Sequence, residues 1–112
     1  MTMNPSQLYL STIDPLAGDI ARREGLGVEI AEFCTAINAD EYFEETHAAV
    51  LRQVEGVRCR MLHGPFNELF PCAIDPLARK LAAYRYAQAL SLAQRYGARK
   101  LVLHAGYSPR LY

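Results

Sequence analysis

The sequence predicts an α/β protein in which parallel strands alternate with helices. Short apolar runs, typical of buried strands, alternate with longer stretches of helical periodicity. Two of the apolar runs, residues 57–63 and 99–104, each end in a histidine. Glycines 25, 56 and 97 stand where each helical stretch ends. Because strand–helix–strand units form right-handed crossovers, the strands are expected to make one parallel sheet.

The first unit begins with a strand over residues 7–12. Asp14 followed by Pro15 indicates a helix start, because the carboxylate can cap free N–H groups and proline suits the first helical position. This helix is expected to run to about Glu24. The second strand is predicted over residues 26–33.

The second helix is predicted over residues 40–55, after a loop at residues 34–39. Four of its side chains recur at helical spacing and predict the face that packs on the sheet: Phe43, His47, Val50 and Val54. His47 is therefore expected to be a packing residue. The third strand follows over residues 57–63.

The loop over residues 64–74 is long for a strand-to-helix connection, and such loops often carry function. Asp75 and Pro76 then repeat the earlier helix start. The helix is expected to reach Tyr96 and to pack through a stripe of mostly small residues: Ala82, Ala83, Tyr86, Ala87, Leu90 and Ala93. A fourth strand over residues 99–104 follows. The chain is expected to stop at Tyr112 without room for a fourth helix.

Length and composition narrow the class of protein. At 112 residues the chain is expected to be a single domain, residues 1–112. The formal net charge is zero, which gives no electrostatic footprint for nucleic acid or an anionic membrane. No apolar run approaches the roughly 20 residues that span a bilayer, and residues 1–7 lack a signal-peptide core. The three cysteines are widely spaced, which favours reduced thiols in a cytoplasmic protein over a disulfide or a metal site: Cys34, Cys59 and Cys72.

The two strand-end histidines predict a shared site. Strand side chains alternate between faces, so His63 lies on the face of Met61 and His104 on that of Val102. Leucines 62, 101 and 103 then face the helices. If the sheet curls, both imidazoles point inward at one rim, where neighbouring strands about 4.8 Å apart let them reach one metal ion. The alternative is a pair of ordinary strand-end histidines, since two ligands fall short of the three or four of a zinc site.

Carboxylates near this rim are candidates for acid–base or binding roles. Glu29 and Glu32 are expected to face opposite ways on the second strand, and Glu29 is the one assigned to the site as a catalytic residue. Glu68, in the long loop, is assigned to substrate binding; its alternative is a solvated loop carboxylate.

Three segments, residues 27–30, 62–65 and 93–106, resemble the xylose-isomerase-like TIM barrel superfamily. That superfamily contains sugar (phosphate) isomerases and epimerases and the AP endonuclease family 2 enzymes of the endonuclease IV type. The resemblance implies half of a (β/α)8 barrel, with strands one to four and helices one to three. It matches His63 and His104 to metal-binding histidines of the endonuclease IV branch, or to substrate contacts in the isomerase branch. It matches Glu29 to an inward-facing acidic residue at the end of strand two.

The resemblance implies an N-terminal fragment of a metal-dependent sugar or sugar phosphate isomerase or epimerase, using zinc or manganese. Family members draw carboxylates from the second half of the barrel, so the fragment is not expected to be competent alone. One alternative is an endonuclease IV-type zinc enzyme fragment, although the neutral charge disfavours a DNA groove. Another is a non-catalytic half-barrel whose open edges pair with a second copy or with a missing C-terminal half. A flavodoxin-like domain is disfavoured, because no glycine-rich phosphate loop follows the first strand.

Overall fold

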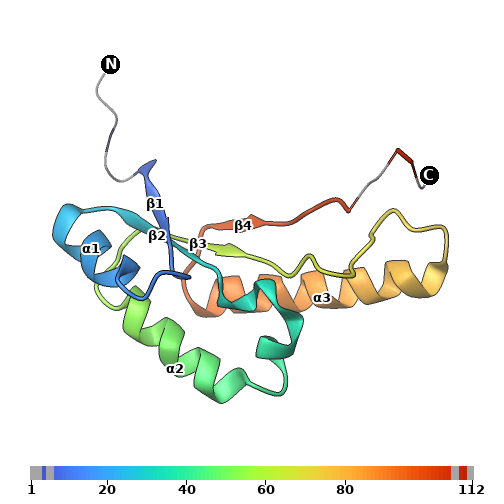
Figure 1. The fold of residues 1–112 in the computed structure, drawn as a ribbon, viewed down its shortest axis with the longest axis horizontal. Coiled ribbons are helices and arrows are strands. Elements are labelled where there is room, and N and C mark those ends of the chain that lie inside the picture. Colours follow the sequence, from blue (N-terminus) through green and yellow to red (C-terminus); the bar gives the residue numbers. More distant parts are fainter. Residues whose placement is uncertain (1–3, 5–6, 107–108, 111–112) are drawn as a thin grey trace.

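A computed structural model describes residues 4, 7–106 and 109–110 and contains one four-stranded sheet, in which every neighbouring pair of strands is parallel. The strands are β1 (Tyr9–Ser11), β2 (Gly27–Ile30), β3 (Arg60–His63) and β4 (Lys100–Val102), in the spatial order β1-β2-β3-β4 (Figure 1). The helices are α1 (Ala17–Glu24), α2 (Phe43–Val54) and α3 (Pro76–Arg95). The predicted α/β class with parallel β–α units is therefore confirmed. The residues before Asn4 and the predicted end at Tyr112 lie outside the described part.

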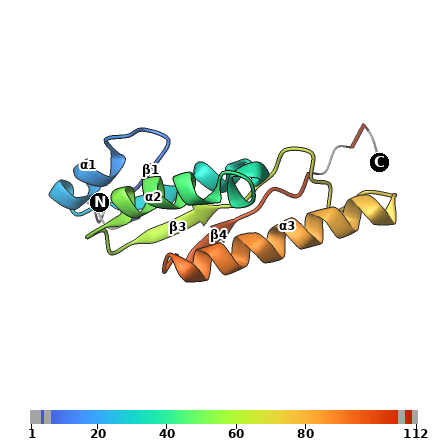
Figure 2. The same cartoon turned by 90° about the horizontal axis from the view of Figure 1, so that it is seen from below.

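All three helices contribute to one hydrophobic core on a single face of the sheet. Ala21 of α1, Val50 of α2 and Ala89 of α3 are buried there together with Val28 and Leu62 from the strands. Leu101 packs against this core as predicted, whereas Leu103, past the end of β4, is 41% exposed. Figure 2 shows α3 lying alongside β4, with its N-terminal end projecting beyond the strands.

Long side chains from the two edge strands meet on the opposite face of the sheet. Lys100 and Tyr9 lie on the two edge strands, which in a flat sheet would be about 14 Å apart at about 4.8 Å per spacing. Both side chains are long and extend toward each other, so the Lys100 ammonium lies 5.4 Å from the centre of the Tyr9 ring. Gly27 gives that ring room, because a Cβ atom on Gly27 would lie 2.7 Å from it. Glu29, Met61 and His63 lie on this same face, opposite the helices.

The second strand is shorter than predicted. It ends at Ile30, and a 3₁₀ turn, η2 (Glu32–Cys34), follows, with a second turn, η3 (Ala36–Ala39), inside the predicted loop. The hydroxyl of Thr12 explains the early end: it accepts a hydrogen bond from the Ala31 N–H and donates one to Glu32. Glu32 therefore belongs to a turn and does not alternate with Glu29 on a strand.

Two aspartates act at helix starts, but at different places. Asp75 is the N-cap of α3, and its carboxylate accepts the Leu77 N–H at 2.9 Å, as predicted. Asp14 makes the same bond to Leu16, also at 2.9 Å, but the regular helix begins only at Ala17. The predicted glycine stops are confirmed, because Gly25, Gly56 and Gly97 all have positive φ.

The predicted packing stripe of α3 is partly wrong. Ala82 and Ala93 are buried as expected, but Ala83, Ala87 and Leu90 are exposed. The buried face instead runs through Ala82, Ala89, Leu92 and Ala93. The error has a physical cause: α3 carries apolar side chains around most of its circumference, so periodicity does not single out one face. Within the described ranges, no helix has both the length and the apolar character needed to span a membrane.

Candidate metal centre

His63 and His104 meet at the carboxyl end of the sheet. His63 is the last residue of β3 and pairs with Val102 of β4, so His104, two residues on, points to the same side. Their Nε2 atoms lie 3.0 Å apart, and their ring centroids 4.9 Å. The predicted meeting of the two imidazoles at one mouth of the sheet is therefore confirmed.

A backbone carbonyl fixes which nitrogen of His63 carries the hydrogen. Its Nδ1 lies 2.8 Å from the Gly64 carbonyl oxygen, and because a carbonyl only accepts, Nδ1 must donate. In the neutral ring the Nε2 lone pair then points at His104. An N–H held by a backbone carbonyl with the other nitrogen free is the arrangement that orients metal-binding histidines in proteins.

The spacing of the two Nε2 atoms fits a shared ion. Two nitrogen ligands about 2.1 Å from one ion lie about 3.0 Å apart at a right angle, and about 3.4 Å apart at the tetrahedral angle. The observed 3.0 Å lies at the lower end of this range. Without a metal, the same distance lets the Nε2–H of His104 donate to His63. The pair can thus hold either a proton or a divalent cation.

The described residues supply only these two ligands at this place. Among them, no group of three or more histidine, cysteine or acidic side chains is arranged to hold a metal ion. Cys34 lies close, with its Sγ 3.9 Å from the His63 carbonyl oxygen. Burial, with the charges of Glu29 and Glu32, raises the pKa of the Cys34 thiol to about 11. In the metal-free protein Cys34 is therefore a thiol at neutral pH.

The two predicted carboxylates lie in different surroundings. Glu29 pairs with Met61 across β2 and β3, which places it on the face of the sheet opposite the helices, two residues before the position of His63. No hydrogen bond joins it to either ring in the described structure. Glu68 lines a pocket with Asp40 and Arg85, whereas His104 borders a separate, open pocket of mainly apolar lining.

His47 packs in the core region as predicted. Its ring stacks on Phe43 with centroids 5.3 Å apart, and its Nδ1 lies 2.7 Å from the Tyr96 hydroxyl. Burial raises the pKa of Tyr96, so that phenol remains protonated and able to donate. This third histidine contacts Phe43 and Tyr96 and is not part of the His63–His104 pair.

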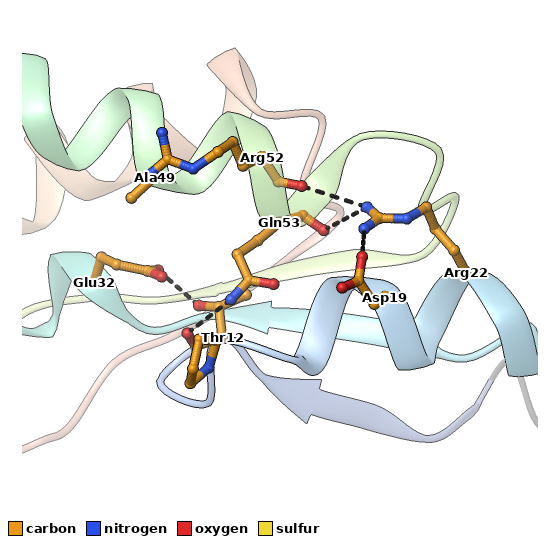
Figure 3. Close-up of a pocket in the computed structure, with 8 residues that line it drawn as sticks. Thr12, Asp19, Arg22, Glu32, Ala49, Arg52 and Gln53 are labelled. Atoms are coloured by element: carbon orange, nitrogen blue, oxygen red, sulfur yellow. Dashed lines mark hydrogen bonds and ion pairs between the residues drawn. The ribbon is translucent and has the colours of Figure 1, made fainter.

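A polar pocket between α1 and α2 was not predicted (Figure 3). In it, the Gln53 side chain donates to the carbonyls of Thr12 and Asp14 and accepts the Gly18 N–H. Arg22 of α1 donates to carbonyls at the end of α2, including that of Glu55 at 2.7 Å. Because these groups bond to one another across the two helices, we interpret the pocket as the joint that fastens α1 to α2. Only long-range contacts mark it, so no local sequence signal could have revealed it.

Comparison with known proteins supports the fold. No protein-family model matches this sequence, and no curated protein matches it either. Among solved structures, the TTHB071 protein from Thermus thermophilus, in a structure obtained with ZnCl2 soaking, matches with a TM-score of 0.68 and 24% identity. The match covers 90% of this chain and 39% of that one. This chain thus spans well under half the length of that protein, and the likeness concerns the fold alone.

Proposed function

We propose that this chain is the N-terminal half of a metal-dependent TIM barrel enzyme of the sugar (phosphate) isomerase and epimerase type. His63 and His104 are two ligands of its divalent metal, zinc or manganese. The observation that carries the proposal is the 3.0 Å approach of two Nε2 atoms, one of them oriented by the Gly64 carbonyl. The parallel four-stranded sheet with its three connecting helices supports the barrel.

The residues of this half have distinct tasks in the proposed enzyme. Two neutral imidazoles leave the positive charge of the ion intact, and a bound divalent metal would polarise a substrate carbonyl and hydroxyl. Glu29, on the same face of the sheet as His63, is the carboxylate of this half that can accept a proton from the substrate or return one to it. The remaining ligands and carboxylates come from the second half of the barrel. Isolated residues 1–112 therefore bind metal without completing the reaction.

Calorimetric titration with Zn²⁺ and with Mn²⁺ tests the proposal. The unmodified chain should bind one ion, and His63→Ala or His104→Ala should weaken binding by at least about tenfold, the smallest loss seen even for residues outside the ligand set. His47→Gln is the matched control, because it removes the third histidine away from the site. Equal affinity in all four proteins, or no binding to the unmodified chain, refutes the metal centre.

The open edges of the sheet favour a second candidate, a non-catalytic half-barrel that assembles by strand pairing. β1 and β4 each have a neighbour on one side only within the described sheet, and exposed strand edges tend to pair with other chains. The partner would be a second copy or a C-terminal half. Light scattering of the purified chain tests the homodimer: a monodisperse monomer across the micromolar range contradicts it.

A third candidate, an endonuclease IV-type nuclease, would use the same two histidines. Cleavage of a DNA duplex that contains an abasic site, by the complete barrel, would distinguish this nuclease from the isomerase. Zero net charge makes this the weaker proposal. The three free thiols fit a reducing compartment, and we place the protein in the cytoplasm on that basis.

A further inference from the structure

The loop between β3 and α3 lays one aromatic ring against both imidazoles. Phe66 stacks on His104, with centroids 4.6 Å apart and planes inclined by 17°. The same ring meets His63 edge-on, at 5.4 Å and 66°. A phenyl group can neither ligate a metal nor accept a proton. Its ring contacts give it a way to act on this site through the orientation of the two imidazoles.

Backbone geometry holds Phe66 in this place. The Leu69 N–H donates to the Phe66 carbonyl at 3.3 Å, and the turn that makes this bond has Glu68 at a φ of 66°. Glu68 is the one non-glycine residue with positive φ in the described part of the chain, which marks a constrained turn. Leu69, only 4% exposed, anchors it.

The segment after β4 packs closely against the same turn. Gly106 has a φ of 63°, and a Cβ atom there would lie 2.6 Å from the Leu69 carbonyl oxygen. In addition, the Tyr86 hydroxyl of α3 donates to the His104 carbonyl at 2.8 Å. The backbone of His104 is thus bonded to α3, while its ring stacks on Phe66. Two loops that are far apart in sequence meet where the imidazoles meet.

We propose that Phe66 is a positioning residue: by stacking on His104, it holds the Nε2 atom of that ring aimed at the Nε2 atom of His63. Where it concerns metal affinity, the inference rests on the proposed metal centre. The orientation of the rings is a property of the metal-free protein as well. The two parts can therefore be tested separately.

The test compares Phe66→Leu with Phe70→Leu. Phe70 lies in the same loop, is similarly exposed (39% against 36%), and makes no ring contact with either imidazole in the described structure. Proton–nitrogen NMR of the metal-free protein follows the His104 ring protons and the tautomers of both rings. Phe66→Leu should remove the ring-current shift of His104 and let its imidazole populate a second orientation. Phe70→Leu should leave these signals in place.

Calorimetry with Zn²⁺ gives the second readout. Loss of an aromatic pair should weaken zinc binding by about two- to tenfold in Phe66→Leu, and Phe66→Tyr, which keeps the ring face, should restore it. Equal affinities of Phe66→Leu and Phe70→Leu overturn the positioning role. If the unmodified chain binds no zinc, the proposed metal centre is refuted, and the NMR comparison alone tests the positioning role of Phe66. Unchanged His104 signals in Phe66→Leu then overturn the inference, and changes confined to the two imidazoles uphold it. Circular dichroism confirms that both variants are folded.

Discussion

Replacing Thr12 by valine should destabilise the protein more than any other change of similar size at a strand end. Threonine has nearly the same shape as valine, and Thr12 is buried, with only 4% of its surface exposed. Its hydroxyl accepts the Ala31 N–H at 2.9 Å and donates to a Glu32 carboxylate oxygen at 2.6 Å. Thr12→Val removes both bonds without opening a cavity, so the change in stability reports the hydroxyl alone.

The magnitude follows from these two bonds. Leaving a buried backbone donor without a partner costs about 1–3 kcal/mol, and a hydrogen bond to a charged group is worth about 1.5–3 kcal/mol. Glu32 is only partly buried, so water recovers part of the second term. We expect a total loss of about 2–4 kcal/mol in the free energy of unfolding.

Urea denaturation followed by circular dichroism at 25 °C measures this loss. Thr12→Ser keeps the hydroxyl and should lose less than half as much. Thr35→Val is the matched control, because Thr35 is exposed and makes no capping bond. A Thr12→Val protein within about 0.5 kcal/mol of the Thr35→Val control, the usual range for surface substitutions, would refute the account of how β2 ends.

Two further predictions concern titration. Burial and nearby carboxylates raise the pKa of Cys34 from 9.0 to about 11, so its thiolate fraction at pH 8 is about a hundredth of that of an unperturbed thiol. Alkylation of Cys34, measured by mass spectrometry, should be slower in the same proportion. A rate equal to that of an unfolded peptide refutes this prediction. Since the folded state holds this proton more tightly, stability should also fall as pH rises from 9 to 11. Hydrogen bonds from Arg85 and Gln88 lower the pKa of Asp40 below 3.8, so their stabilising effect is present above pH 3.8 and is lost as pH falls through the lowered value. Arg85→Met should raise this pKa toward 3.8 in an NMR titration, and an unchanged pKa contradicts the assignment.

Local signals predicted most of the elements. Asp75 before Pro76 marks the start of α3, and glycine at 25, 56 and 97 marks helix ends, because a single residue satisfies the backbone there. The alternation of strand side chains was enough to place His63 and His104 on one face. These features depend on residues close in sequence, so periodicity and capping reveal them.

Features that depend on distant residues were missed. Thr12 ends β2 from 19 residues away along the chain, through its bond to Ala31. The packing of α3 against the sheet decides which of its faces is buried, because its apolar residues are spread around most of the helix. The side pocket that contains Glu68 likewise depends on Arg85 of α3 coming alongside Asp40.

The sequence by itself determined the order of strands and helices and the side of the sheet on which each histidine lies, because hydrogen-bonded backbone geometry repeats every two residues in a strand. Only the tertiary structure decided that the two Nε2 atoms stand 3.0 Å apart. The approach of the two rings and the stacking of Phe66 on His104 are contacts between the end of β3 with its following loop and the segment that follows β4. Both arise from packing between segments distant in sequence, which side-chain periodicity does not encode.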